Sequence, residues 1–223
     1  MRTLGLLAGL LLIGGCGDDG GGDGNVNIDS GPPVIDAMPN AVMTFFVTST
    51  GNGASGGDLG GLSGADAKCQ NLATNAGAGS RTWHAYLSTD SPVVNARDRI
   101  GSGPWSNQAG VMVATNLADL HNGVAGSLIL TELGNVVPSD PLDHDILTGS
   151  TSDGNVESGK TCNDWTSGSD AFGAQVGHAD IAAEDVGLPP DKESWNSQHD
   201  PQCDVASLAA TAGTGRIYCF AID

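Results

Sequence analysis

Two kinds of side chain are scarce in this sequence, basic ones and aromatic ones. It has 8 Lys and Arg against 26 Asp and Glu, a formal net charge of −18. Nucleic acids and anionic lipid surfaces attract basic proteins, so this balance argues against a nucleic-acid partner and favours solubility or cation binding. Aromatic residues make up 4% of the chain and glycine occurs 34 times, so we expect a small core and long irregular loops.

Long apolar runs are also missing. The run at residues 4–13 has ten residues and is interrupted only by Gly5 and Gly9. A membrane-spanning helix needs about 20 apolar residues, so this run does not predict one. Because it follows a basic start and precedes Gly14 and Gly15, residues 1–15 are typical of a secretory signal peptide.

A cysteine follows these small residues, and Ile13-Gly14-Gly15-Cys16 resembles the bacterial lipobox. The resemblance implies that Cys16 is acylated and becomes the N-terminus of an exported lipoprotein. Such a protein is anchored by lipid in the bacterial cell envelope, at the outer membrane or the cell surface, and several acyl chains make that anchoring stable. The alternative is an ordinary cleaved signal peptide in which Cys16 has no such role.

The segment after the signal, residues 16–41, is rich in Gly, Asp, Asn and Pro and has few large side chains. Because it cannot bury enough apolar surface to fold, we expect an acidic, flexible tether. Removal of residues 1–15 leaves 7 basic and 26 acidic residues, a net charge of −19. Residues 42–223 have the size of one domain.

Residue patterns within this domain predict a few regular elements. β-Branched and aromatic side chains predict strands. The expected strands are residues 42–48, 82–87, 111–113, 128–130 and 216–222. A helix is expected to start at Ser63 as its N-cap and to end at Gly77, with one apolar stripe between them. Residues 93–100 suggest a second, short helix.

Four cysteines remain once Cys16 is assigned to the lipid, and they are Cys69, Cys162, Cys203 and Cys219. An even number in an exported chain predicts two disulfides. No two of them have Cys-x-x-Cys spacing, which disfavours a metal site built from cysteines. Three pairings are possible, and spacing alone does not choose among them.

Six segments around these cysteines share their pattern with a known superfamily. They are Lys68-Cys69-Gln70, Trp83-His84-Ala85-Tyr86-Leu87-Ser88, Asp98-Arg99-Ile100, Thr148-Gly149-Ser150, Cys162-Asn163-Asp164-Trp165 and Ile217-Tyr218-Cys219-Phe220. Over residues 45–222 the chain resembles the C-type lectin-like superfamily, especially the endostatin-like domain of collagens and a family of bacterial lipoprotein domains of unknown function. The resemblance implies an α+β fold with a small twisted antiparallel sheet, one main helix and long irregular loops. It also implies two nested disulfides, Cys69–Cys219 and Cys162–Cys203.

Two departures limit what this resemblance implies about ligands. The sugar-binding branch holds Ca²⁺ and sugar with Glu-Pro-Asn or Gln-Pro-Asp and with Trp-Asn-Asp, and none of these triplets occurs here. The zinc ligands of endostatin lie near its N-terminus and find no matching histidines in this chain. A lectin-like fold is therefore expected without sugar binding being implied.

A cluster of acidic residues is the main candidate for binding a cofactor. Asp140, Asp143, His144 and Asp145 place three carboxylates and an imidazole within six residues, a spacing that offers oxygens to Ca²⁺ in a loop. Lectin-like domains bind calcium in their long loop, which supports a Ca²⁺ site at Asp140, Asp143 and Asp145. The alternative is a solvated acidic turn, and no other cofactor is expected.

Other residues that suggest chemistry have simpler interpretations. His178 and His199 lack an identifiable nucleophile beside them and are expected on the surface. Trp105 is expected as an exposed contact, whereas the other three tryptophans are expected in the core around the bridges. The Gly-x-Gly-x-x-Gly pattern at residues 51–56 is not followed by the βαβ unit that a dinucleotide site requires.

The sequence predicts no catalytic arrangement, so we expect that the protein is not an enzyme. The leading hypothesis is a binding or adhesion domain displayed on the cell envelope, with loops in residues 115–201 contacting an extracellular glycan or protein. One alternative is a structural envelope protein without a dedicated ligand. The other is an enzyme, since some lectin-like relatives are oxidases or modify sulfatases, but those rely on reactive cysteines.

The lipid anchor is tested by mass spectrometry of the N-terminal peptide from natively expressed protein. We expect diacylglycerol mass on Cys16, because the lipobox cysteine is the acylated residue. An unmodified Cys16 would contradict the lipoprotein hypothesis and leave the ordinary signal peptide.

Overall fold

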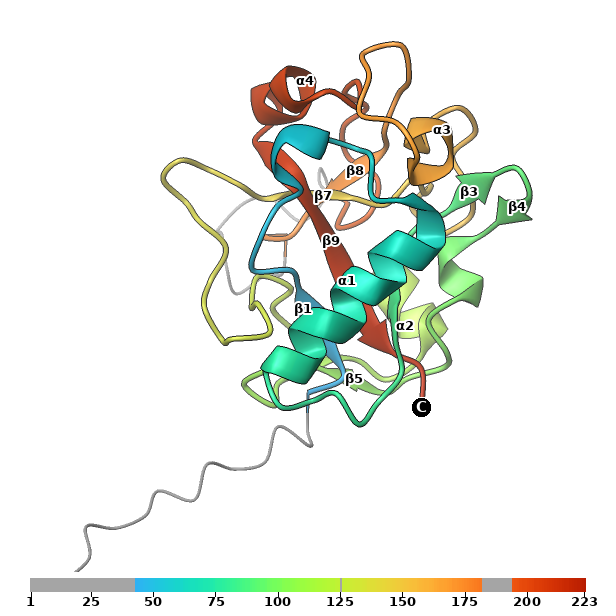
Figure 1. The fold of residues 1–223 in the computed structure, drawn as a ribbon. Coiled ribbons are helices and arrows are strands. Elements are labelled where there is room, and N and C mark those ends of the chain that lie inside the picture. The colour runs from blue at the N-terminus through green and yellow to red at the C-terminus, as the bar shows by residue number, and fades with distance from the viewer. Residues whose placement is uncertain (1–42, 125, 182–193) are drawn as a thin grey trace, which may run out of the picture. The chain divides into compact units, whose positions relative to one another are not determined.

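A computed structural model describes residues 43–124, 126–181 and 194–223 (Figure 1). The predicted signal peptide of residues 1–15, the predicted lipidation site Cys16 and the predicted tether of residues 16–41 lie outside these ranges. Within them, no helix is long and apolar enough to cross a membrane.

A five-stranded sheet forms the centre of the domain. Its strands are β1 (Phe45–Val47), β2 (Trp83–Ala85), β7 (Asp145–Leu147), β8 (Val176–His178) and β9 (Gly213–Ala221). Strand β9, red in Figure 1, pairs antiparallel with β1 and β2 and parallel with β7, and β7 pairs antiparallel with β8. The α+β class is confirmed. The expected antiparallel sheet is wrong in one respect, because the long connection from β7 to β9 lets these two strands run parallel.

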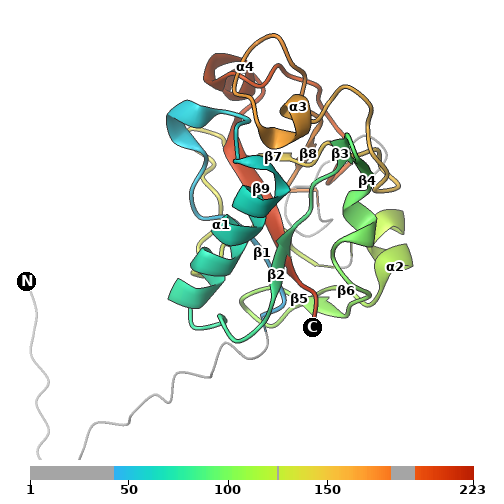
Figure 2. The same ribbon diagram turned by 45° about the vertical axis from the view of Figure 1, so that its right-hand side comes forward.

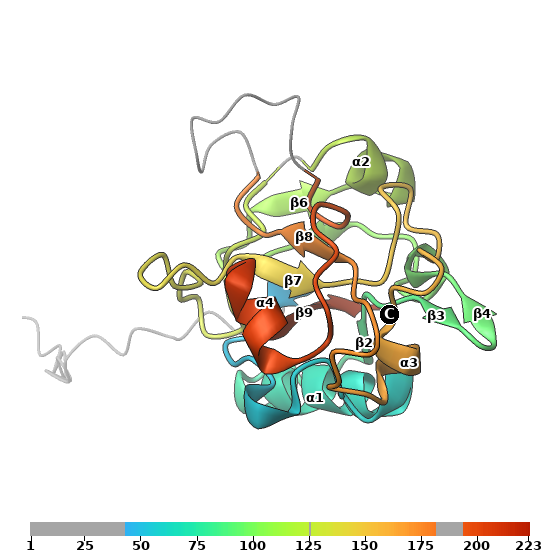
Figure 3. The same cartoon turned by 90° about the horizontal axis from the view of Figure 1, so that it is seen from above.

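Helix α1 (Gly61–Asn75) covers one face of this sheet, as Figures 2 and 3 show. Its predicted apolar stripe is present, since Ala65, Cys69 and Ala73 are buried. The predicted start at Ser63 is wrong: the N-cap is Gly60, which has φ 75°. Glycine has no Cβ and adopts this left-handed conformation without strain. The helix therefore begins directly after Gly60 rather than at Ser63.

The remaining elements are short. They are β3 (Thr89–Asp90), β4 (Val93–Val94), β5 (Trp105–Ser106), β6 (Met112–Ala114), α2 (Leu117–Asn122), α3 (Cys162–Trp165), α4 (Val205–Ala210) and the 3₁₀ turns η2 (Gly53–Ser55) and η3 (Ala96–Asp98). Strands β3 and β4 pair with each other, as do β5 and β6. The β5–β6 pair and α2 lie on the face of the main sheet opposite α1 (Figure 3).

Two sequence-based predictions are corrected in these short elements. Residues 93–100 form β4 and η3 rather than one helix, because Val93 pairs with Asp90 and the Ser88 hydroxyl accepts a hydrogen bond from the Ala96 amide. Residues 128–130 form only an isolated bridge, in which Leu130 pairs with Val136, whereas the strand predicted at residues 111–113 is present as β6.

Side chains that alternate along β9 enter two core clusters. Ile217 and Cys219 face the cluster on the α1 side, and Tyr218 and Phe220 face the other cluster.

Trp105 is 1% exposed and packs edge-on against Phe220 with ring centroids 5.3 Å apart. The predicted exposed contact is therefore wrong for Trp105, because Phe220 gives its ring a buried partner. The other three tryptophans are buried as expected.

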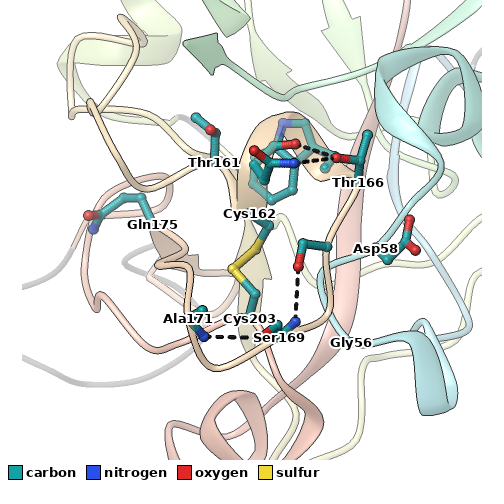
Figure 4. The surroundings of a disulfide bond; sticks show 12 residues. Gly56, Asp58, Thr161, Cys162, Thr166, Ser169, Ala171, Gln175 and Cys203 are labelled. Carbon is teal, nitrogen blue, oxygen red and sulfur yellow. Dashed lines mark hydrogen bonds between the residues drawn. A yellow bond between two sulfur atoms is a disulfide. The ribbon is translucent and has the colours of Figure 1, made fainter. Parts of the chain in front are cut away.

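Both disulfides implied by the resemblance are present. The Cys69–Cys219 bridge ties α1 to β9, and the Cys162–Cys203 bridge ties α3 to the loop before α4 (Figure 4). A Cβ on Gly57 would clash with the Cys162 sulfur, so glycine is required beside the second bridge.

The Cys162–Cys203 bridge begins at an unusual turn. All four residues of α3 have φ between 51° and 66°, the left-handed region, which costs about 1–2 kcal/mol for each L-residue. The turn is stabilised by the buried Trp165 ring, whose Nε1 donates to the Ser88 carbonyl at 2.7 Å. The Asp164 carboxylate adds a hydrogen bond from the Asp90 amide at 2.6 Å. Tertiary contacts therefore outweigh the local strain.

The two bridges are expected to differ in their contribution to stability. They close loops with sequence separations of 150 and 41 residues. On the chain-entropy model, replacing Cys69 and Cys219 by Ala removes about 5 kcal/mol, and replacing Cys162 and Cys203 by Ala removes about 4 kcal/mol. Urea unfolding of both double variants measures the difference. If replacing Cys162 and Cys203 lowered the free energy of unfolding more than replacing Cys69 and Cys219, loop length would not determine how much each bridge stabilises the domain.

Candidate functional site

Three side chains of metal-ligand type meet at one end of the β7–β8 pair: His144, Asp145 and His178. The antiparallel register places Asp145 directly opposite His178, so their side chains leave the same face. His144 precedes β7, and its carbonyl accepts a hydrogen bond from the Ala179 amide at 2.9 Å. The β7–β9 register shifts between Asp145 and Ile146, and such irregularities redirect side chains.

The three groups are close to one another. Asp145 Oδ1 lies 3.1 Å from His178 Nε2 and 3.7 Å from His144 Nε2. The imidazole rings of His144 and His178 stack with centroids 4.2 Å apart. His199 adds a third ring, with its centroid 4.8 Å from that of His178.

Burying the Asp145 carboxylate of this cluster is energetically unfavourable. Asp145 is 1% exposed, and in the described part of the chain neither of its oxygens accepts a hydrogen bond. A buried carboxylate without hydrogen bonds is strongly disfavoured unless opposite charge lies beside it. Within the described residues, the two imidazoles lie closest to this carboxylate, and either a protonated imidazole or a bound cation would compensate its charge.

Asp180 orients His144 from the other side. His144 Nδ1 lies 2.8 and 2.9 Å from the two oxygens of Asp180. Burial raises the pKa of the Asp180 carboxyl, but the hydrogen bond and the charge of His144 lower it more, so the pKa lies below its ordinary value. A neutral His144 therefore carries its proton on Nδ1 and directs the lone pair of Nε2 toward Asp145.

His144 and Asp180 also line a surface pocket of about 180 Å³. Its other walls are mainly apolar and include Ile129, Val136, Val137, Pro138 and Leu142. A second pocket of about 230 Å³ shares Pro138 and Leu142 with it and continues to Ala209 of α4. The two adjoining cavities form one surface, the paired pocket.

A larger pocket of about 480 Å³ lies at the end of β9, lined by Trp105, Arg81 and Asp223 among others. Arg81 Nη1 donates to the Asp223 carbonyl at 2.6 Å, so these two groups bond to each other. The paired pocket, in contrast, has the His144–Asp180 pair in its wall and the buried carboxylate of Asp145 behind it. The chemistry therefore favours the paired pocket despite its smaller volume.

The structure separates the residues predicted to bind Ca²⁺. Asp140 is exposed, Asp143 pairs with Arg216 (Oδ2–Nε 2.6 Å), and Asp145 alone joins the histidine cluster. Calcium binding stays a prediction, but these three carboxylates do not converge on one point.

His178, expected on the surface, is 4% exposed because β8 pairs with β7. No local pattern identifies His178, since β8 has only three residues.

The site belongs to a mixed α+β domain closed by two disulfides, with a His–Asp–His cluster behind an apolar surface pocket. No protein-family model matches this chain, and no curated protein matches its sequence. The functional argument therefore depends on the geometry of these residues.

The Asp143–Arg216 pair yields a stability test. Both side chains are at most 7% exposed, and Asp143 also accepts a hydrogen bond from the Thr214 hydroxyl at 2.9 Å. Asp143→Ala leaves the Arg216 charge buried and is expected to cost about 3–5 kcal/mol in urea unfolding. Asp140→Ala, at an exposed position, is the control and should change stability by less than about 0.5 kcal/mol. Equal effects would contradict the structural role of Asp143.

Proposed function

We propose that this protein is an exported lipoprotein of the bacterial envelope, anchored through Cys16, whose C-type lectin-like domain binds a partner and catalyses no reaction. Two formed disulfides support export, because such bridges persist in oxidising compartments. The single long helix on a small sheet and the nested bridges support the lectin-like assignment. All four cysteines of the domain are bonded, which disfavours enzymes that depend on reactive thiols.

The paired pocket is the observation on which the binding role depends. Most of its lining residues come from the loop before β7, drawn in yellow in Figure 1, and the rest come from α4, the start of β9 and Asp180. Three aliphatic side chains on this loop are exposed: Leu133 (57%), Val136 (58%) and Leu142 (46%). Apolar side chains gathered beside a concave surface mark an interaction site, because exposing them to water is unfavourable without a partner.

The lining of the paired pocket favours a polypeptide partner over a glycan. Sugar rings pack their C–H faces on aromatic rings, whereas no Phe, Tyr or Trp lines the described walls of either cavity. Aliphatic walls instead accept aliphatic anchors such as Leu or Val. The net charge of −18 and the exposed Asp140, which is adjacent in sequence to the lining residues Ser139 and Pro141, favour basic residues beside that anchor. The partner is therefore an extended segment with an aliphatic anchor and flanking Lys or Arg.

Selection from a displayed library of random peptides against the full-length protein tests this function. Enriched peptides are expected to share an aliphatic anchor with basic flanks. Leu142→Asp should weaken binding of the enriched peptides at least tenfold, because it places a charge in the shared wall of both cavities.

The matched control is Val93→Asp, since Val93 is 66% exposed on the β3–β4 hairpin, far from the yellow loop in Figure 1. This control should leave peptide binding unchanged. Equal binding by the Leu142→Asp variant would contradict the site. No enrichment of peptides would overturn the binding role and favour a structural envelope protein, and retention on a glycan array instead would overturn the choice of a polypeptide.

A further inference from the structure

The donor atoms of the His144–Asp145–His178 cluster suit a particular class of cation. Two imidazole nitrogens and one carboxylate oxygen are ligands that Zn²⁺ and neighbouring transition metals prefer, whereas Ca²⁺ and Mg²⁺ prefer sets made of oxygen. Three protein ligands of this kind with a fourth position left for another donor are an established zinc arrangement. The chemistry of the cluster therefore differs from that of the predicted calcium site.

The spacing of the donor atoms also fits. Bonds of about 2.0–2.1 Å in a tetrahedral site place the ligand atoms about 3.3 Å apart. Asp145 Oδ1 lies 3.1 Å from one imidazole nitrogen and 3.7 Å from the other, and all three atoms lie within 4.8 Å of one another. Coordination of one ion would also turn one imidazole out of the stack, because the lone pair of each nitrogen lies in the plane of its ring and the two rings are 19° from parallel.

Charge is the second and independent observation. The buried Asp145 carboxylate accepts no hydrogen bond from the described residues, and Asp180 adds another carboxylate on the far side of His144. If both carboxylates are ionised, balancing them through the histidines alone places two imidazolium rings 4.2 Å apart, and these repel each other. One divalent cation with two neutral histidines balances both carboxylates without that repulsion.

His144 makes the kind of hydrogen bond, through its other ring nitrogen, that metal-bound histidines make. Asp180 accepts from His144 Nδ1 at 2.8 Å, the carboxylate–histidine contact that fixes ring orientation and strengthens the ligand. His144 also lines the pocket of about 180 Å³, which gives an ion a path from solvent. The surrounding negative charge of the protein raises the local concentration of cations.

We propose that His144 Nε2, the Asp145 carboxylate and His178 Nε2 bind one divalent transition-metal ion, with Zn²⁺ as the preferred occupant and Asp180 as the positioning residue for His144. Asp145 and His178 do not line the cavity of about 180 Å³, whereas His144 lines it, so the metal site shares one ligand with the paired pocket but does not require a bound peptide.

Zinc titration of the full-length protein, freed of metal by a chelator, tests this site. We expect one Zn²⁺ per chain by calorimetry, a rise in melting temperature on adding Zn²⁺, and intense tetrahedral absorption bands with Co²⁺ as the probe. X-ray absorption of the zinc form should show two imidazole ligands. Asp145→Asn, which keeps the shape but removes the charge, and His178→Gln should each weaken Zn²⁺ binding at least 100-fold.

His84→Gln is the matched control, because His84 is a half-buried histidine on β2 whose Nδ1 lies 3.0 Å from the Arg99 carbonyl, outside the cluster. It should bind Zn²⁺ as the parent protein does. Near-ultraviolet circular dichroism and mapping of both disulfides establish that each variant is folded. If Asp145→Asn does not fold, His178→Gln and the absorption spectrum decide the question.

The proposal is overturned if the folded parent protein binds neither Zn²⁺ nor Co²⁺. It is also overturned if a folded Asp145→Asn or His178→Gln variant binds Zn²⁺ like the parent, since the ions would then sit on surface carboxylates.

Discussion

Hydrogen bonding along β9 is the constraint on which the rest of the domain depends. This strand pairs with β1, β2 and β7, and Cys219, two residues before its end, is bonded to Cys69 of α1. Its alternating side chains enter both core clusters. Because β9 lies near the end of the chain, these contacts join segments far apart in sequence, and closing such loops costs entropy that the buried core and the long-range bridge must offset.

The position of the cluster follows from β9 through β7. Parallel pairing of β7 with β9 places Asp145 at one end of the sheet, and β8 then brings His178 opposite it. The segment that contains Trp195 crosses β8 at Gly177, where a Cβ would clash with the Trp195 backbone. A rigid sheet therefore positions the cluster, whereas the adjoining pocket is built by the loop before β7, the usual division between scaffold and binding surface.

The two proposed sites meet at His144. Its Nδ1 bonds to Asp180 in the pocket wall, and its Nε2 faces Asp145 behind that wall. An ion held by Nε2 would fix the ring that forms part of the pocket, so occupancy of the buried site would make the wall of the paired pocket more rigid. Preorganised walls reduce the entropy that a partner loses on binding, which gives a physical link between the two sites.

The sequence by itself determined the features that depend on local pattern. The β-branched strands at residues 42–48 and 216–222 and the apolar stripe of α1 follow from side-chain periodicity, and the even cysteine count predicted two bridges. The pairing of these cysteines was predicted from the resemblance to the C-type lectin-like superfamily and not from local pattern. Only the tertiary structure decided that Trp105 is buried against Phe220 and that His178 lies opposite Asp145. The reason is that local pattern sets which face of an element is apolar, whereas long-range register sets which side chains meet across it.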